Sequence, residues 1–250
     1  MIDIIILAAG KGTRMKSDIP KVLSDLNGRP MISYLLDTIS QLSLPREPII
    51  VVGYKKEMVK DALGSSYRYV HQKEQLGTGH AVMSALPALS EETSHVIVLY
   101  GDMPFVSSST LSTLIDTHKS SEAPLTMATT DPGDFNGWKA GFNNYGRIIR
   151  GEEGEITGIC EYRDASEDIR SNTEVNPSYF CIDREWLSDA LHNLKNTNAS
   201  GEYYLTDLAH MASQERGMIP SITIDPIEAL GANTKEQFKI LKTIQDEHTF

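Results

Sequence analysis

A glycine-rich segment near the N-terminus holds the residues whose types and spacing point most directly to chemistry. An apolar run leads into Leu7-Ala8-Ala9-Gly10-Lys11-Gly12-Thr13-Arg14-Met15. Glycine and alanine let the backbone approach a flat base or a phosphate closely, and consecutive amide N–H groups in such a turn bind anions. The spacing fits neither the dinucleotide fingerprint nor the P-loop, which disfavours a dehydrogenase or an ATPase. Alone, the segment predicts a nucleotide or phosphate site, or a plain strand-to-helix turn.

The charge distribution favours a small phosphorylated ligand. The 250 residues carry a formal net charge of −11, so the summed field repels nucleic acid and anionic membrane surfaces. We therefore expect no nucleic-acid partner and no membrane partner. Positive charge is nevertheless concentrated in one short stretch, at Lys11, Arg14, Lys16 and Lys21, which suits a small phosphorylated ligand. Within this stretch we expect Lys16 to be a solvated loop side chain rather than a ligand.

Two polar residues further along the chain suit ligand binding. Asp102 follows the apolar run Val96–Leu99, and the carboxyl ends of strands are where open α/β sheets bind ligands. The Asp102 carboxylate is a suitable ligand for Mg²⁺. Alternatively, Asp102 only caps the turn that follows the strand. Gln72 offers a donor and an acceptor to the imide edge of a pyrimidine, or is an ordinary surface glutamine. The scattered histidines His71, His80, His95 and His118 form no catalytic signature.

The elements that must position these residues follow from hydrophobic periodicity. Short β-branched runs alternate with amphipathic segments in the first half, which is typical of a mainly parallel sheet covered by helices. Beyond about residue 130 the sequence is turn-rich and contains hairpin-like pieces, so we expect a lobe over the sheet. The predicted strands are 2–7, 49–52, 67–71, 96–99 and 219–224, and the predicted helices are 31–42, 57–63, 77–86, 186–194, 205–211 and 235–244.

Composition indicates a cytoplasmic location. The apolar fraction of 40% and the charged fraction of 23% are ordinary for a soluble protein. Asp3 stands where a signal peptide has basic residues. Cys160 and Cys181 both lie in strand-like apolar runs, which suits small buried side chains in a reducing compartment. We expect no disulfide and no export, and no sequence signal indicates an oligomeric state.

Several ordered motifs resemble those of the sugar-nucleotide pyrophosphorylases, a family of nucleotidyltransferases. The glycine-rich segment continues into Ser-Asp-Ile-Pro-Lys-Val-Leu at 17–23. Within the family, the runs 72–81 and 99–104 are most similar to the N-terminal uridylyltransferase domain of the bifunctional enzymes that make UDP-N-acetylglucosamine. The resemblance spans nearly the whole chain, since further matching motifs occur in the family order at 145–148, 158–161, 201–207 and 231–233.

The resemblance implies both a fold and a reaction. The fold is α/β, of the nucleotide-diphospho-sugar transferase type, with a Rossmann-like, mainly parallel central sheet flanked by helices and a smaller sugar-binding β lobe. It implies a single domain over 1–250, with a nucleotide-binding half at 1–130, a sugar-binding lobe and metal residue at 131–233, and a C-terminal helix at 234–250. The implied enzyme uses Mg²⁺ to convert UTP and a sugar 1-phosphate, foremost N-acetylglucosamine 1-phosphate, to a UDP-sugar and pyrophosphate.

The same resemblance implies a role for each matching residue. Arg14 and Lys21 neutralise the triphosphate, and this suits a transfer that depends on positioning and charge rather than on a nucleophilic side chain. Asp102 and Asn233 hold Mg²⁺. The implied nucleotide-binding residues are Leu7, Ala8, Ala9, Gly10, Gly12, Gln72, Gly77 and Thr78, and the implied sugar-binding residues are Tyr100, Gly101, Gly146, Glu161 and Asn176.

Two departures from the family pattern leave the acceptor open. Asn176-Pro177-Ser178 stands where the family has Asn-Thr-Gly, and proline removes a backbone N–H and fixes φ. The segment 131–143 is also longer than expected.

Other interpretations stay open. Glu161 is alternatively an exposed acid at a strand end. For the function, the alternatives are an enzyme that uses another hexose 1-phosphate, an enzyme that uses dTTP, CTP or GTP as its nucleotide, or a non-catalytic regulatory protein that binds nucleotide sugars. No hexapeptide repeats are present, so we expect no acetyltransferase activity.

Overall fold

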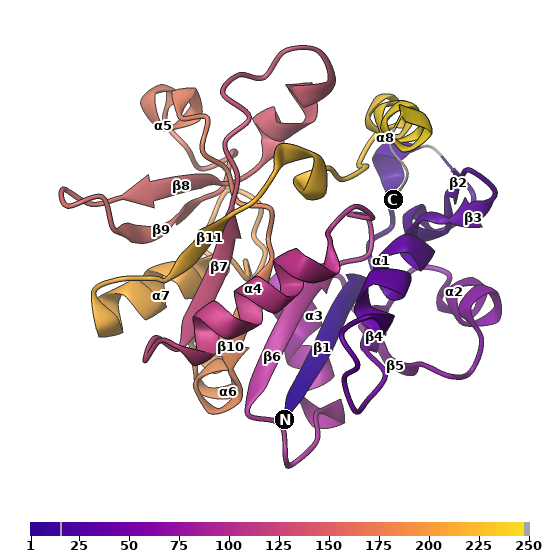
Figure 1. The fold of residues 1–250 in the computed structure, drawn as a ribbon, viewed down its shortest axis with the longest axis horizontal. Coiled ribbons are helices and arrows are strands. Elements are labelled where there is room, and N and C mark those ends of the chain that lie inside the picture. The colour runs from indigo at the N-terminus through magenta and orange to yellow at the C-terminus, as the bar shows by residue number, and fades with distance from the viewer. Residues whose placement is uncertain (16, 248–250) are drawn as a thin grey trace.

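A seven-stranded sheet forms the centre of the computed structural model, which describes residues 1–15 and 17–247. Lys16 and residues 248–250 therefore lie outside the described part, and with them the environment expected for Lys16. The strand order is β11-β7-β10-β6-β1-β4-β5 (Figure 1). Neighbouring strands run parallel except where β10 pairs with β6 and β7. The predicted Rossmann-like, mainly parallel sheet is confirmed.

The strands of the sheet begin and end close to the predicted positions. Strand β7 has no counterpart among the predicted elements, and β10 was indicated only by the apolar run around Cys181. The strands are β1 (Ile2–Ala8), β4 (Ile49–Val52), β5 (Arg68–His71), β6 (His95–Tyr100), β7 (Leu125–Thr129), β10 (Phe180–Asp183) and β11 (Ser221–Thr223).

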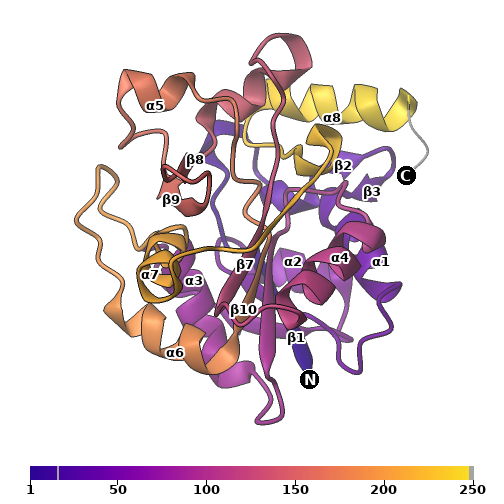
Figure 2. The ribbon, with the colours of Figure 1, turned by 60° about the vertical axis from the view of Figure 1, so that its left-hand side comes forward.

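Helices cover both faces of the sheet. Strand β1 shows why this is necessary, because Ile4 and Ile6 enter one apolar cluster while Ile5 and Leu7 enter the other. A strand buried on both faces requires such a continuous apolar run. Figure 2 shows the two helical layers on opposite sides: α1 (Met31–Ser40), α2 (Lys56–Leu63) and α4 (Ser108–Lys119) on one, and α3 (Thr78–Ala85), α6 (Arg184–Asn193) and α7 (Asp207–Arg216) on the other.

Helix α4 was not predicted, and its composition explains the omission. It is rich in serine and threonine, which have lower helix propensity than alanine or leucine. Its start is fixed by the Ser107 side chain, which accepts a hydrogen bond from the Thr110 amide at 3.1 Å. Leu111, Leu114 and Ile115 bury its inner face. Tertiary packing therefore stabilises a helix that local propensity does not indicate.

The chain between β7 and β10 leaves the sheet and forms the expected lobe (Figure 1). An isolated antiparallel bridge between Thr130 and Val175 closes the lobe at its base, with N···O distances of 3.1 and 2.8 Å. Arg147 is fully buried inside the lobe and donates to backbone carbonyls that include those of Asn143 and Arg170. The lobe contains the 3₁₀ segment 137–144, the hairpin β8 (Arg147–Arg150) and β9 (Ile156–Cys160), and α5 (Glu167–Ser171).

Small elements complete the described chain. Helix α8 (Lys235–Glu247) packs beside the segment 137–144. The remaining pieces are the two-stranded ribbon β2 (Asp25–Leu26) and β3 (Arg29–Pro30) and the 3₁₀ turns 13–15, 21–23, 86–88 and 226–229.

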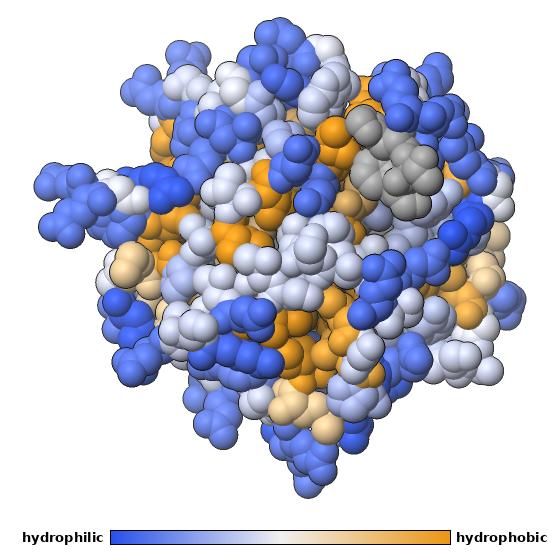
Figure 3. Space-filling view, in the orientation of Figure 1, coloured by the Kyte–Doolittle hydropathy of each residue, from blue (hydrophilic) through white to orange (hydrophobic). Residues whose placement is uncertain are grey.

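The predicted location rested on the composition, on the acid near the N-terminus and on the cysteines, and the structure bears on only part of this. None of the described helices is apolar enough over a sufficient length to cross a membrane. On the face seen in Figure 3, apolar residues show as patches among polar ones. Cys160 in β9 is half-buried, Cys181 in β10 is buried, and both are free thiols. The predicted strands around both cysteines are confirmed, although Cys160 is less buried than expected.

Candidate active site

Two adjoining cavities lie at the carboxyl ends of the parallel strands β1, β5 and β6. The larger, about 700 Å³, is lined by the glycine-rich segment and is named the loop cavity here. The smaller, about 240 Å³, is lined partly by the lobe and is named the lobe cavity. The two cavities share the lining residues Thr78, Tyr100, Asp102, Glu202 and Asn233. A ligand that extends through both would pass these shared residues.

The glycine-rich segment forms one wall of the loop cavity, and the turn that leads into α3 at Gly77 and Thr78 forms another. Gly77 has φ +112°, and a Cβ there would lie 2.6 Å from the Tyr203 carbonyl oxygen. Only glycine fits this backbone-to-backbone contact. Of the predicted nucleotide-binding residues, the structure places in this cavity wall Leu7, Ala8, Ala9, Gly10, Gln72, Gly77 and Thr78.

Gly12 is the one predicted nucleotide-binding residue that does not line the loop cavity. It has φ +57°, and a Cβ at this position would lie 2.9 Å from the Cβ of Lys21. A side chain there would therefore collide with Lys21 in addition to straining the backbone. In this structure Gly12 allows the loop to pack against the stem of Lys21.

Gln72 is buried rather than exposed, which rules out an ordinary surface glutamine. Its amide nitrogen donates to the Gly77 carbonyl at 3.1 Å and lies 3.1 Å from His80 Nδ1. The carbonyl neighbour fixes which end of the amide is the nitrogen, because a carbonyl only accepts hydrogen bonds. The Gln72 amide oxygen has no hydrogen bond to another described side chain, so it remains available as an acceptor for a ligand in the loop cavity.

The Lys21 ammonium bridges two residues that are predicted to hold a metal ion. It donates to Asp102 Oδ2 and, at 2.8 Å, to Asn233 Oδ1. Both the lysine and the aspartate side chains are largely buried, so each charge needs the other. The structure thus brings together Lys21, Asp102 and Asn233, which are separated by up to 212 positions in the sequence.

Arg14 lies apart from this group. It is exposed, belongs to the 3₁₀ turn 13–15, and lines neither cavity. It makes no hydrogen bond or ion pair with another described residue. Its neighbours Lys11 and Thr13 line the loop cavity instead. An interaction of Arg14 with a phosphate would require the exposed side chain to turn toward the cavity.

The lobe cavity contains a partly buried carboxyl group. Glu161 accepts a hydrogen bond from Thr206 Oγ1 at 2.8 Å. Burial raises the pKa of the Glu161 carboxyl, and the Thr206 hydrogen bond opposes that shift. Glu161 therefore lies in a cavity wall and is not a free acid at a strand end. Its carboxyl oxygens offer a hydrogen-bonding group suited to hydroxyls or to an amide.

The segment that departs from the family pattern also lines the lobe cavity. Asn176 Oδ1 accepts from the Ser178 amide at 2.8 Å, and Asn176 Nδ2 donates to Ser178 Oγ at 3.1 Å. Ser178 has φ +63°, a conformation that side-chain-bearing residues seldom adopt. Serine at this position therefore engages both ends of the Asn176 amide, which leaves that amide less free to contact a ligand.

The other predicted sugar-binding residues divide into two groups. Tyr100 and Gly146 line the lobe cavity together with Glu161 and Asn176. Burial raises the pKa of Tyr100 well above its usual value, so its hydroxyl stays protonated. Gly101 lines neither cavity, and a Cβ there would lie 3.1 Å from Ile32 and from Val22. Its small size allows the turn after β6 to pack closely.

Sequence reasoning gave no role to several residues of the cavity walls. Glu202 lines both cavities, and Tyr204 lines the lobe cavity. Both belong to the motif 201–207, so the motif was the signal that could have identified them. Gln75 and Tyr145 also belong to runs that carry the resemblance, whereas Ser178 had only the departure from the family pattern as its signal.

The family of this chain is shown by comparison with known proteins. Residues 4–211 match the family described as the MobA-like NTP transferase domain. The chain belongs to this family. Curated relatives named bifunctional protein GlmU include those of Heliobacterium modesticaldum, 43% identical over 93% of this chain and 49% of the relative, and Brevibacillus brevis, 40% identical over 94% and 50%. The chain thus spans about half the length of these relatives. These matches support a sugar-phosphate nucleotidyltransferase and confirm the resemblance carried by the motifs.

Solved structures bear out the fold. A protein assigned as a glucose-1-phosphate thymidylyltransferase from Bacillus anthracis, in complex with a sucrose, aligns with a TM-score of 0.75 at 16% identity, covering 100% of this chain and 97% of that one. The 4-diphosphocytidyl-2C-methyl-D-erythritol synthase of Anaerococcus prevotii aligns with a TM-score of 0.65 at 15% identity, covering 98% of each chain. At such low identity the likeness concerns the fold alone.

Proposed function

We propose that this chain transfers a uridylyl group from UTP to a sugar 1-phosphate, foremost N-acetylglucosamine 1-phosphate, and releases pyrophosphate. The observation that carries the proposal is the Lys21–Asp102–Asn233 group, which lies where the two cavities share their walls. A nucleotide in the loop cavity and a sugar in the lobe cavity would both present their phosphates to this group.

The transfer needs positioning and charge more than it needs a reactive side chain. An anionic oxygen of the sugar phosphate attacks the α-phosphorus of UTP, the new P–O bond forms, and the bond from the α-phosphorus to the bridging oxygen breaks as pyrophosphate leaves. The attacking phosphate is already ionised, so no general base is required. Lys21 stabilises the negative charge that accumulates on the phosphate oxygens, and the backbone amides of the glycine-rich segment orient them.

The residues around Lys21 fit a divalent metal ion. A carboxylate and an amide oxygen converge on one cationic group, and such oxygen ligands suit Mg²⁺. The Lys21 ammonium stands in for a cation at this position. When bound by Asp102 and Asn233, Mg²⁺ would add positive charge beside the phosphates.

The free acceptor on Gln72 supports a uracil base. Its amide nitrogen is engaged by Gly77, so its oxygen is the group left for the ligand. Uracil presents an N–H at position 3, whereas cytosine presents an acceptor there. An acceptor facing an acceptor leaves both unpaired in a dry pocket, which disfavours cytosine.

Support for the sugar comes from two sources. The motifs of this chain resemble the uridylyltransferase domain of the enzymes that make UDP-N-acetylglucosamine, and curated relatives named bifunctional protein GlmU align with it over about half of their length. Within the lobe cavity, Glu161 offers oxygen atoms to the hydroxyls or the acyl amide of a sugar, and Tyr100 offers a protonated hydroxyl. These groups suit a polar ring with several donors.

A pyrophosphate-release assay tests the proposal. Purified protein is assayed with and without Mg²⁺ over a grid of UTP, dTTP, CTP and GTP against N-acetylglucosamine 1-phosphate, glucose 1-phosphate and galactose 1-phosphate. We expect UTP with N-acetylglucosamine 1-phosphate to give the highest kcat/KM. Absence of turnover in the whole grid, with tight UTP or UDP-sugar binding by calorimetry, would instead identify a non-catalytic binding protein. Turnover that prefers another nucleotide or hexose would correct the substrate.

A further inference from the structure

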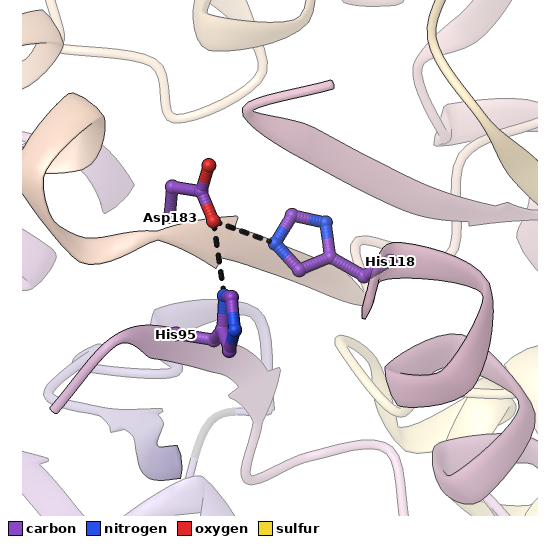
Figure 4. Close-up of side chains that lie close together, drawn as sticks. All are labelled: His95, His118 and Asp183. Atoms are coloured by element: carbon purple, nitrogen blue, oxygen red, sulfur yellow. Dashed lines mark hydrogen bonds and ion pairs between the residues drawn. The ribbon is translucent and has the colours of Figure 1, made fainter. Parts of the chain in front are cut away.

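A second polar cluster lies at the amino end of strand β6, the opposite end from the candidate active site. It consists of His95, His118 and Asp183, whose ligand-type atoms all lie within 4.8 Å of one another. Figure 4 shows both imidazole rings directed at the same carboxylate. His95 opens β6, whereas Asp102 follows its carboxyl end, so about 16 Å of strand separates the cluster from the active site. The proposed transfer uses none of these three residues.

The sheet register and helix α4 bring the three residues together. His95 and Asp183 are direct partners on the antiparallel strands β6 and β10, so their side chains leave the same face of the sheet. Helix α4 packs over β10 on that face. His118 continues the inner stripe of α4 that includes Leu111 and Leu114. The proximity of the three side chains is therefore set by two paired strands and a packed helix, and none of the three lies on a loop.

We propose that His95, His118 and Asp183 form a binding site for a transition-metal ion of the Zn²⁺ class. His95 Nδ1 and His118 Nε2 lie 2.9 and 3.2 Å from the same oxygen, Asp183 Oδ1. In a tetrahedral zinc site with bonds of about 2.0–2.1 Å, neighbouring ligand atoms are about 3.3–3.4 Å apart. The two nitrogen–oxygen distances are thus slightly shorter than a bound ion needs. Small rotations of the partly exposed His95 and Asp183 side chains supply the difference.

The buried histidine has the support that metal-binding imidazoles usually have. His118 Nδ1 lies 2.9 Å from Thr126 Oγ1, and both residues are buried. A hydrogen bond on one ring nitrogen fixes the ring orientation and directs the other nitrogen toward the metal. The Thr126 contact leaves His118 Nε2 as the nitrogen that faces Asp183 and His95.

The surroundings attract cations and leave room beside the cluster. His95 and Asp183 line a cavity of about 550 Å³. Three protein ligands next to an open cavity leave a fourth coordination position for water or a small ligand. The field is negative, because two arginines, Arg184 and Arg216, share the lining with six acidic residues: Glu91, Glu92, Glu122, Asp183, Glu185 and Glu215.

The donor set selects the ion. Imidazole nitrogens suit Zn²⁺, Ni²⁺ and Cu²⁺, whereas Mg²⁺ prefers oxygen ligands and retains its water. The ion would link α4 to β6 and β10. Because it binds the folded chain, it would raise the apparent stability, and the gain grows with the logarithm of the ion concentration once that concentration exceeds the Kd.

Zinc binding can be measured directly on chelator-treated protein. The Asp102→Asn variant serves as background, because it weakens competing binding at the active site. We expect isothermal titration calorimetry to show one Zn²⁺ bound per chain and a rise in Tm with added Zn²⁺, with no comparable rise with Mg²⁺. His95→Ala in the same background should weaken Zn²⁺ binding at least about tenfold.

Matched variants make the outcome decisive. His192→Ala removes an exposed histidine of α6 and should leave both measurements unchanged. Asp183→Asn replaces a partly exposed ligand, so it tests the site even if variants of the buried His118 fail to fold. Wild-type zinc affinity in both His95→Ala and Asp183→Asn would overturn the proposal, as would the absence of zinc binding. These results do not depend on nucleotidyl transfer.

Discussion

The loop cavity and the lobe cavity share a wall but are built in different ways. The loop cavity draws most of its lining from two continuous stretches, 7–13 and 72–81, and much of it is backbone, glycine or alanine. The lobe cavity is assembled from side chains of separate segments around positions 100, 145, 161, 177, 203 and 233. A site made of closely packed backbone tolerates few substitutions, whereas one made of side chains changes with single residues. We therefore expect the nucleotide to be fixed more firmly than the sugar.

The shared wall should give the largest effect, because a change there affects both cavities. Asp102→Asn should lower kcat about 100-fold or more, equivalent to about 2.7 kcal/mol, with a much smaller change in UTP affinity. The reason is that positive charge beside the phosphates matters most as charge builds in the transition state. Steady-state kinetics and UTP calorimetry measure the two quantities. Asp189→Asn, an exposed aspartate of α6, is the control; unchanged turnover in Asp102→Asn would refute a role in binding metal.

Replacing Lys21 tests whether its ammonium occupies a cation position. Lys21→Met should lower kcat about 10- to 100-fold, because a charge that stabilises the transition state is lost. The same variant should reach half-maximal rate at a lower Mg²⁺ concentration, since the ammonium no longer competes for the oxygens of Asp102 and Asn233. A Mg²⁺ titration of the rate measures this shift. A higher Mg²⁺ requirement would show that Lys21 supports metal binding instead.

A change confined to the loop cavity should alter only the nucleotide. Gln72→Ala should reduce the preference for UTP over CTP by about tenfold, because the acceptor for the imide N–H is lost. The KM for the sugar phosphate should stay the same. Gln75→Ala is the matched control, since Gln75 lines the same cavity but its amide nitrogen donates to the Gln72 backbone. Equal effects of the two variants would indicate general damage to the cavity.

A change confined to the lobe cavity should affect the sugar and the stability in opposite directions. Glu161→Gln should raise the KM for the sugar phosphate about tenfold. It should also raise Tm by about 2 °C at pH 8, because a neutral amide removes the cost of burying a carboxylate. The pKa of Glu161 in the folded protein is above its usual value of 4.5. The cost of burying the carboxylate therefore appears as the pH rises above 4.5, and it is complete once the pH is well above the folded-state pKa.

Thermal unfolding at two pH values checks the sign of this effect. The gain in Tm for Glu161→Gln should be smaller at pH 5 than at pH 8, because the native carboxyl of the wild type is then partly protonated. Glu167→Gln, on the short helix α5, is the control and should show little difference between the two pH values. A lower Tm at pH 8 would mean that the Thr206 hydrogen bond outweighs the cost of burial.

The elements that could be predicted are those whose own sequence determines them. Strand β1 is a continuous apolar run, and its bounds differ from the prediction by one residue. Helix α4 and strand β7 could not be predicted, because α4 owes its stability to packing and β7 is a short segment inside the sheet. The residues that line the loop cavity at 7–10 and 72–78 could also be predicted, because each group lies within one continuous sequence motif.

Contacts between distant segments required the structure. The bridge from Lys21 to Asn233 spans most of the chain, and no local pattern indicates it. The hydrogen bonds that Ser178 makes with Asn176, and the packing roles of Gly12 and Gly101, depend on what lies across the cavity or behind the turn. The cluster of His95, His118 and Asp183 depends on strand register, and the sequence had shown only scattered histidines.

The bridge between Thr130 and Val175 has a consequence for how this fold can change over time. The lobe leaves and re-enters the sheet through two adjacent backbone positions, so in the chain it is an insertion between β7 and β10. It also packs on the rest of the domain, with β9 against α7 and the segment 137–144 beside α8. A lobe of different length that kept these packing surfaces could line the lobe cavity differently while the strands that carry the glycine-rich segment stayed the same.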